Sequence, residues 1–299
     1  MVKIGIIGVG YFGEIHLKNL LNLSEKFNVI GIYDINKERA SEISKKYKID
    51  QFDSLKSLIK NCEAVNITCA TNSHFEVIKK CIKNNKHIFI EKPLSENLEN
   101  SKEILKLSKS YKPIIQIGFI ERFNDVFLNL TKFNFSIKEI YAIRTGMLSE
   151  RNKSSCIIQD MMIHDLDIIN YLIQSSIKNI SINKKSTKDK VMCQIKFNNN
   201  CIANIETERS EKICKDKSER KILIKTNSNK KITLDFLNKK ICINKKEGKE
   251  IKKTNALSNE LIYFYECISN KKINKLSIES AYGVELISHQ IKKQLNEIL

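Results

Sequence analysis

Residues 1–118 alternate short apolar runs with longer amphipathic stretches, a pattern that predicts a parallel, doubly wound sheet. The intervening stretches are rich in the helix-forming residues Lys, Glu and Leu, and capping residues at Asp53–Ser54, Asn72–Ser73 and Ser95 mark expected helix starts. The expected strands are β-branched or aromatic runs at residues 2–7, 28–33, 64–68, 87–90 and 114–119. We therefore expect an α/β domain of Rossmann type over residues 1–118.

Beyond residue 119 the pattern changes to that of an α+β domain. Helices are expected at about residues 123–130 and 158–173, on either side of a strand at 139–145. Short strands joined by Asn-rich and Lys-rich turns then follow, at residues 178–183, 190–197, 201–208, 221–226, 231–236 and 240–244. Two closing helices, at about 258–269 and 277–298, complete a predicted second domain over residues 119–299 with a largely antiparallel open sheet.

Composition narrows the class of protein without naming a function. The 299 residues are 41% hydrophobic, which suffices for two cores, and nine Gly with two Pro exclude collagenous sequence. No apolar run reaches the length of a membrane span, and the first ten residues lack the pattern of a secretory signal. Nine scattered cysteines without a C-x-x-C pair suggest neither a disulfide framework nor a zinc site. We expect a cytoplasmic protein with no metal and no membrane partner.

The formal net charge of +18 raises the question of nucleic-acid binding. Only six of the 52 basic residues are arginine, which is the side chain favoured for planar phosphate and base recognition. The lysines are spread over the whole chain, there is no tryptophan, and no basic stripe is interleaved with aromatics. We therefore expect no nucleic-acid partner.

A G-x-G-x-x-G motif at residues 8–13 follows the first expected strand and opens a helix, which is the context of a dinucleotide-binding fingerprint. In such a motif the first glycine permits a tight turn, the second lets the backbone approach the pyrophosphate, and the third lets helix and strand pack closely. The phosphates bind at the positive helix N-terminus. The residues expected at the cofactor are Gly8, Gly10, Tyr11, Phe12 and Gly13.

Asp34 ends the second expected strand, at the spacing where an acidic residue hydrogen-bonds the adenosine ribose. A 2′-phosphate would meet the like charge of this carboxylate, although Lys37 and Arg39 just downstream could partly compensate. The cofactor expected is NAD, with NADP less favoured. The alternative role for Asp34 is that of an ordinary helix-capping acid.

Four segments together resemble one family of enzymes. GIIGVGYFG starts the chain, IFIEKPL ends the fourth expected strand, GFIERFN follows the fifth, and D-x-x-x-H-D-x-D begins at Asp160 on an expected helix. In this order and spacing they are similar to the Gfo/Idh/MocA oxidoreductases. The resemblance covers essentially the whole chain and implies an NAD-binding Rossmann domain followed by a substrate-binding and oligomerisation domain.

The residues that would carry chemistry are Lys92, Asp160 and His164. Asp160 and His164 are four residues apart, so on a helix they share a face. Oxidising an alcohol with NAD removes a hydride from carbon and a proton from oxygen, which needs a base with a pKa near neutrality. His164 is the candidate base, Lys92 would donate to the reacting oxygen, and Asp160 would orient the imidazole or hold a sugar hydroxyl. The resemblance implies the same catalytic roles.

Structural alternatives exist for each of these residues. A histidine on an amphipathic helix is often structural, and Asp165 and Asp167 could face solvent or cap backbone groups instead of acting directly. Thr71 and His74 match a loop that lies near the cofactor in the family, but His74 could equally be a helix-start residue. Glu91, which precedes Lys92, is also expected at the cofactor.

The resemblance implies oxidation of a sugar ring hydroxyl to a ketone. The substrate it implies is UDP-N-acetylglucosamine or a related UDP-sugar, oxidised at C3. Arg122 and Arg151, with Arg144, bracket the expected sugar site, and guanidinium suits bidentate diphosphate contact, although surface ion pairs would also explain them. Alternatives are an inositol or free-sugar dehydrogenase of the family, or a non-catalytic NAD sensor. A sheet with one uncovered face suggests a homodimer or homotetramer.

Overall fold

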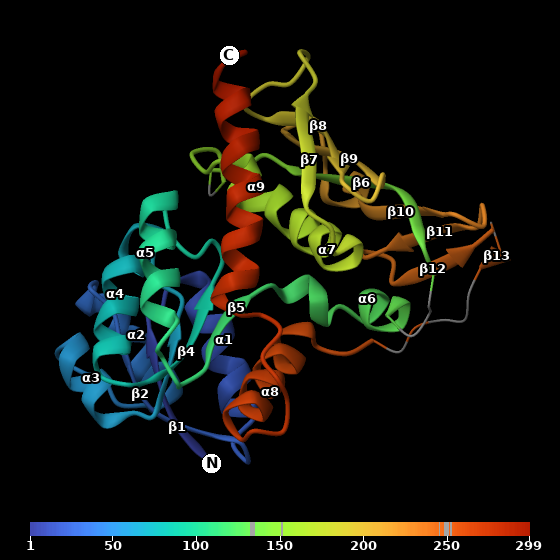
Figure 1. Ribbon diagram of the computed structural model, residues 1–299. Coiled ribbons are helices and arrows are strands. Elements are labelled where there is room, and N and C mark those ends of the chain that lie inside the picture. The colour runs from blue at the N-terminus through green and yellow to red at the C-terminus, as the bar shows by residue number, and fades with distance from the viewer. Residues whose placement is uncertain (132–134, 151, 245, 248–250, 252) are drawn as a thin grey trace. The chain divides into compact units, whose positions relative to one another are not determined.

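A computed structural model describes residues 1–299 apart from 132–134, 151, 245, 248–250 and 252, and it divides into two compact units (Figure 1). Unit 1 comprises residues 1–120 and 255–283, and unit 2 comprises residues 121–254 and 284–299. The first boundary lies two residues from the predicted one. Residues 255–283 lie in unit 1, whereas the sequence pattern grouped them with the second domain.

Unit 1 contains a five-stranded parallel sheet of order β2-β1-β3-β4-β5, which confirms the predicted doubly wound sheet. Its strands are β1 Val2–Ile7, β2 Phe27–Tyr33, β3 Ala64–Ile67, β4 His87–Glu91 and β5 Ile115–Gly118. Its helices are α1 Tyr11–Asn22, α2 Lys37–Tyr47, α3 Leu55–Asn61, α4 Thr71–Lys83, α5 Leu98–Ser108 and α8 Ala256–Ile268.

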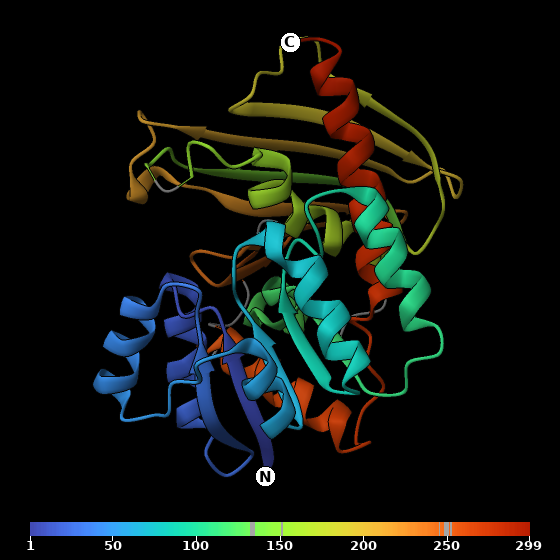
Figure 2. The same cartoon turned by 90° about the vertical axis from the view of Figure 1, so that its left-hand side faces the viewer.

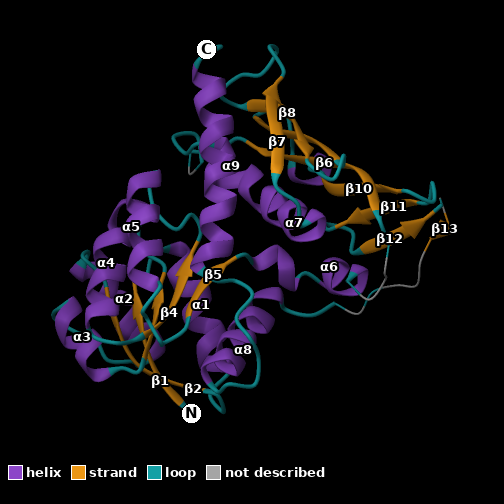
Figure 3. Cartoon of the chain, viewed as in Figure 1, coloured by secondary structure: helices purple, strands orange, loops and turns teal. Residues whose placement is uncertain are grey.

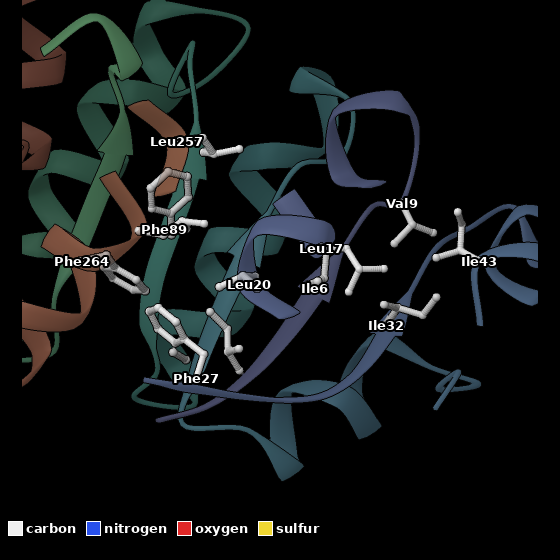
Figure 4. Packing of buried hydrophobic residues seen from close by; sticks show 13 residues of the cluster. Ile6, Val9, Leu17, Leu20, Phe27, Ile32, Ile43, Phe89, Leu257 and Phe264 are labelled. Atoms are coloured by element: carbon white, nitrogen blue, oxygen red, sulfur yellow. The ribbon is translucent and has the colours of Figure 1, made fainter. Parts of the chain in front are cut away.

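Helices cover both faces of this sheet, and β3 and β5 are accordingly buried at every position. On one face, Ile6 of β1 joins Leu17 and Leu20 of α1 and Phe264 of α8 in a buried cluster (Figure 4). On the other face, a Cβ added at Gly5 would lie 2.8 Å from the Leu58 side chain of α3. The apolar face of α8 completes the first of these layers, which explains why residues 255–283 return to unit 1.

Helix starts in unit 1 correct part of the sequence prediction. Ser54 caps α3 as expected, with its side chain accepting from the Ser57 amide. The expected start at Asn72–Ser73 is wrong, because α4 begins at Thr71 after Ala70, without a side-chain cap. The expected start at Ser95 is also wrong: the α5 cap is Asn97, and the Ser95 hydroxyl donates to the Asn97 carbonyl in the preceding turn.

Unit 2 is built on an eight-stranded sheet of order β13-β12-β11-β10-β6-β9-β8-β7 (Figure 3). The β6–β9 pair is parallel and the other neighbours are antiparallel, which confirms the predicted largely antiparallel sheet. Its strands are β6 Ile137–Met147, β7 Ile177–Ile182, β8 Lys190–Phe197, β9 Ile202–Ser210, β10 Arg220–Thr226, β11 Lys231–Asp235, β12 Lys240–Ile243 and β13 Lys246–Glu247.

The helical elements of unit 2 lie against one face of its sheet (Figure 2). Alternate residues of β9 are buried, and the residues between them are partly exposed on the opposite face, where the described residues place no helix. The helical elements are α6 Asp125–Leu130, a π-helical turn η2 at Ile158–Met162, α7 Ile163–Ile173, and α9 Ile278–Asn296, which begins in unit 1. Two short 3₁₀ turns lie at Ile120–Phe123 and Lys215–Lys217.

Among the helices that the described residues form, none combines the length and apolar composition that a bilayer span requires.

Candidate active site

The carboxyl ends of the parallel strands bring the predicted cofactor residues of unit 1 to one edge of the sheet. Gly8 follows β1, Asp34 follows β2, and the loop to Thr71 follows β3. Glu91 is the last residue of β4, and Lys92 begins the next loop. In doubly wound sheets, ligands bind beyond this edge.

The glycine loop has the backbone geometry that its motif predicts. Gly8 has φ +90°, and a Cβ there would lie 2.5 Å from the Cys69 backbone, so the position requires glycine. At Gly13 a Cβ would lie 2.0 Å from the Gly8 carbonyl oxygen, which shows the close approach of α1 to the loop. By contrast, a Cβ at Gly10 would meet nothing within 4 Å. Gly10 caps α1 without a side-chain bond, and Tyr11 and Phe12 are exposed in its first turn.

Asp34 fixes the same loop from the second strand. Its Oδ2 accepts from the Val9 amide at 2.7 Å, and its Oδ1 accepts from the Asn36 amide at 2.9 Å. Arg39 contacts Val9 as well, because its Nε donates to the Val9 carbonyl at 3.0 Å. An open glycine, an exposed helix start and an acid at the second strand end fit a dinucleotide. The residues placed to hold one are the glycine loop and Asp34.

His74 joins two loops at this edge instead of lying exposed. Its Nδ1 is 2.9 Å from the Pro93 carbonyl oxygen, and its Nε2 is 3.1 Å from that of Cys69. Burial lowers the pKa of His74 below its ordinary value, so the ring is neutral near pH 7 and donates one proton. The bridge ties the β3–α4 loop to the loop of Lys92, whose peptide bond to Pro93 is cis. Thr71 is half-buried at the start of α4.

Glu91 is held from the helix side of the sheet. The Asn66 amide nitrogen lies 3.1 Å from His16 Nδ1, and because it can only donate, the imidazole proton lies on Nε2. That nitrogen is 3.0 Å from Glu91 Oε1. His16 and Asn66 are both buried, so three elements converge on the residue before Lys92.

In unit 2, Asp160 and His164 lie on consecutive helical segments. Asp160 belongs to the π-helical turn η2, and His164 is the second residue of α7. Single π-helical turns inside α-helices occur frequently at functional sites. Both side chains are half-buried, whereas Asp165 and Asp167 are almost completely buried.

Two buried arginine pairs hold the start of α7. Arg144 of β6 donates to both carboxylate oxygens of Asp165, at 2.7 and 2.9 Å. Arg122 donates likewise to Asp167, at 2.7 and 2.5 Å, and its guanidinium lies 4.6 Å from the centre of the Tyr171 ring. Such bidentate pairs fix orientation as well as distance.

The pKa values follow from burial and charge in this cluster. Burial raises the pKa of Asp167 above its ordinary value, against the opposing effect of Arg122. Burial disfavours the Arg144 cation, but the charges of Asp165 and Glu121 outweigh it and raise the Arg144 pKa. Glu121 lies between Arg144, at 3.2 Å, and Arg220, at 2.7 Å. Arg144, Arg220, Glu121 and Asp165 therefore form one ion-pair network, in which burial and the charge of Arg144 lower the pKa of Arg220.

Sequence reasoning missed Ser155 and Arg209, which lie behind Asp160. Ser155 Oγ is 3.1 Å from Asp160 Oδ2, and the buried Arg209 donates to Ser155 Oγ and to the Ser155 carbonyl, at 3.0 and 2.8 Å. Arg209 Nη1 also donates to the Asn152 carbonyl, whose oxygen lies 2.8 Å from Ser155 Oγ, so the Ser155 hydroxyl has both this carbonyl and Asp160 as acceptors. The rarity of arginine in this chain was the available signal for Arg209.

No group of three or more His, Cys, Asp and Glu side chains in the described part of the chain is arranged to hold a metal ion.

Comparison with known proteins identifies the nucleotide-binding part. Residues 2–119 match the family model GFO_IDH_MocA, described as an oxidoreductase family with an NAD-binding Rossmann fold. This match assigns residues 2–119 to the Gfo/Idh/MocA family. The resemblance inferred from the motifs is thereby confirmed, and the chain is an oxidoreductase of NAD-binding type.

Relatives within and around the family differ in substrate. UDP-N-acetylglucosamine 3-dehydrogenase of Acidithiobacillus ferrooxidans is 26% identical over 213 residues, 70% of this chain and 67% of the relative. Myo-inositol 2-dehydrogenase of Thermotoga maritima is 27% identical over 230 residues, 70% of this chain and 69% of the relative. A solved structure of the Acidithiobacillus enzyme has TM-score 0.91 at 22% identity and covers 99% of this chain and 98% of its own, which shows a shared fold.

The predicted site residues of this chain fall into two sets. Unit 1 brings the glycine loop, Asp34, Thr71, His74, Glu91 and Lys92 to one sheet edge, and unit 2 carries Asp160 and His164. Arg151 lies outside the described residues. Arg122 as a diphosphate ligand stays a prediction, which its pairing makes less favourable because Asp167 occupies the Nε–Nη2 edge of the guanidinium.

The Arg122–Asp167 pair can be tested by removing one partner or both. Arg122→Leu leaves Asp167 buried without its counter-charge and should lower the free energy of unfolding by about 3–5 kcal/mol, measured by urea denaturation. Arg122→Leu/Asp167→Leu should recover most of this loss, because no charge is then buried alone. Lys153→Met, at an exposed pair with Glu150 in the same unit, serves as the control and should change nothing measurable.

The same variants test the predicted role of Arg122 in substrate binding. A purely structural arginine predicts that the stable double variant has a wild-type KM for substrate. A raised KM in that variant would instead support a direct diphosphate contact.

Proposed function

We propose that the protein oxidises a ring hydroxyl of a sugar to a ketone, with NAD as the hydride acceptor, and that UDP-N-acetylglucosamine or a related UDP-sugar, oxidised at C3, is its substrate. The observation that carries the proposal is the construction around His164. Its neighbours Asp165 and Asp167 are locked by buried arginines, while His164 and Asp160 keep partial exposure. A rigidly held, accessible histidine is suited to proton transfer.

The proposed chemistry divides between named side chains. NAD, when bound, supplies the acceptor for the hydride that leaves carbon. His164 takes the hydroxyl proton, since an imidazole accepts protons near neutral pH. Lys92 donates to the same oxygen and stabilises its developing negative charge. Asp160, held by Ser155, orients the imidazole or a neighbouring hydroxyl.

NAD is proposed over NADP because Asp34 presents a carboxylate where the adenosine ribose is recognised in this type of fold. Both oxygens of Asp34 accept backbone amides, which keeps the carboxylate at the glycine loop. A 2′-phosphate there would face an uncompensated like charge.

The substrate is the finer part of the proposal. It is supported by the likeness to the UDP-N-acetylglucosamine enzyme, whereas the comparably similar inositol enzyme supports a cyclic polyol as the second candidate. A sensor that binds NAD without turnover is the third alternative, and the presence of Lys92, Asp160 and His164 argues against it.

A screen of NADH formation separates these alternatives. We expect a rise in absorbance at the NADH band with UDP-N-acetylglucosamine or its uronate and a much smaller one with inositols or free hexoses. Turnover of inositol alone would contradict the UDP-sugar assignment. Tight NADH binding without turnover of any of these compounds would favour the sensor.

Replacing His164 tests the proposed base. His164→Ala should keep its fold and its NADH affinity while kcat falls by about 10²–10⁴, which is the contribution of a positioned general base. The wild-type rate should rise with pH through an ionisation in the histidine range, and the variant should lack this limb. His289→Ala is the matched control and should leave kcat unchanged. A near-wild-type kcat in folded His164→Ala would exclude His164 as the base.

We also propose that the uncovered sheet face of unit 2 packs against a second copy, as a homodimer or homotetramer. Tyr141 and Leu223 are 37% and 40% exposed on this face. Leu223→Lys should therefore shift the molar mass measured by light scattering toward the monomer. Ile273→Lys, at an 84% exposed site in unit 1, should not shift it. A monomeric wild-type protein would contradict the proposal.

A further inference from the structure

Arg39, in the first turn of α2, is the only arginine among residues 1–118, and each of its three guanidinium nitrogens donates a hydrogen bond. Its Nε donates to the Val9 carbonyl at 3.0 Å, its Nη1 to Glu42 at 2.8 Å and its Nη2 to Glu14 at 2.6 Å. Asp34 accepts from the amide of the same Val9. Asp34 and Arg39 therefore bind the amide and the carbonyl of Val9 in the glycine loop.

Glu14, in the first turn of α1, is the more buried of the two carboxylates that hold Arg39. Its side chain is 14% exposed, whereas that of Glu42 is 59% exposed, and exposed ion pairs contribute little. Lys46 and Tyr47 also donate to Glu14, at 2.8 and 2.7 Å. These bonds and that of Arg39 outweigh desolvation and lower the pKa of Glu14 to about 2, so the carboxylate is charged throughout the working range of pH.

Lys37, the other cation just downstream of Asp34, is also engaged but less firmly. Its Nζ donates to the Asp53 carbonyl at 2.6 Å and lies 5.2 Å from the centre of the Tyr33 ring. It is an exposed ammonium on a flexible stem, which binds phosphate as a point charge without the bidentate geometry of arginine.

We infer that Glu14 is a cofactor-selectivity residue: by holding Arg39 against the glycine loop, it withholds from a 2′-phosphate the guanidinium that lies nearest to the Asp34 side of that loop. The inference rests on the proposed binding of a nicotinamide dinucleotide at this edge. It adds a second element to the selectivity for NAD. Asp34 repels the 2′-phosphate, and Glu14 holds Arg39, the cation that would otherwise pair with that phosphate.

The two elements predict a coupled effect. With Asp34 present, freeing Arg39 should raise the affinity for NADPH little, because the Asp34 carboxylate still repels the 2′-phosphate. With Glu14 present, neutralising Asp34 should also raise the affinity for NADPH little, because Arg39 stays paired with Glu14 and does not reach the 2′-phosphate. Only the removal of both charges should let Arg39 form charge-assisted hydrogen bonds with the 2′-phosphate.

The test is a double-mutant cycle on binding, which needs no substrate. Dissociation constants of NADH and NADPH are measured by fluorescence titration for the wild type, Asp34→Asn, Glu14→Gln and the combined variant, with the fold checked by circular dichroism. Asparagine keeps an acceptor for the Val9 amide. Glu103→Gln, which removes a carboxylate paired with Lys79 in the same unit, is the matched control.

We expect the combined variant to bind NADPH about tenfold or more tightly than Asp34→Asn does, as a new hydrogen bond between charged groups would provide. Glu14→Gln alone and the control should change the NADPH constant by less than about twofold, the spread of weak exposed-charge effects. Adding Arg39→Gln to the combined variant should abolish the gain, whereas adding Lys37→Gln should leave most of it.

Three results would overturn the inference. One is full NADPH binding in Asp34→Asn without Glu14→Gln, and another is a gain that survives Arg39→Gln. The third is weaker NADPH binding by Arg39→Gln in the otherwise native chain, which would mean that Arg39 already contacts the 2′-phosphate in the wild type. This single variant also tests the inference if the combined variant does not fold. A wild type that binds neither nucleotide would refute the proposed function together with the inference, whereas tight NADH binding with unaltered selectivity in the cycle refutes the inference alone.

Discussion

Two buried arginine–aspartate pairs on α7 are the interactions on which the geometry of unit 2 around Asp160 and His164 depends. Each pair takes two full charges out of water, which is costly unless both partners are satisfied. Arg144 and Arg122 meet their aspartates through two hydrogen bonds each, and Glu121 with Arg220 extends the first pair. Because a helix turned or shifted along its axis would break both pairs, the orientation of the first turn of α7 is determined with them. His164, one residue before Asp165, takes its direction from this arrangement.

In unit 1 hydrogen bonds to the backbone, instead of buried ion pairs, fix the position of the glycine loop. The glycine loop has few side chains of its own, so its position is set by hydrogen bonds to its backbone. Asp34 and Arg39 bind the two backbone groups of Val9, and Thr68 Oγ1 donates to the Gly8 carbonyl at 2.7 Å. His74 and His16 then hold the neighbouring loops through carbonyl and carboxylate contacts. The loops at this edge of the sheet are thus held by contacts between protein groups.

Much of this architecture follows from local pattern. The strands of unit 1 were predicted within one or two residues, because buried parallel strands are continuous apolar runs bounded by polar turns. The glycine motif and Asp34 were predictable for the same reason, since their spacing is set by a single strand–turn–helix unit. The helix starts at α4 and α5 were not, because several Ser and Asn residues stand near each start and only backbone geometry selects the cap. The grouping of α8 with unit 1 also escaped, since an amphipathic helix does not specify which sheet its apolar face will meet.

The sequence by itself therefore determined the fold class, the dinucleotide motif and the residue types able to carry out a hydride-transfer reaction. The tertiary structure alone decided which charges pair: Arg122 with Asp167 across 45 positions, Arg39 with Glu14 across 25, and Arg209 with Asp189 across 20. It also decided that Asp160 stands in a π-helical turn, where an i, i+4 pattern alone predicts a regular helix. The physical reason is that apolar periodicity is a property of neighbouring residues. The sequence around a charged residue does not show which distant residue will neutralise its charge when it is buried.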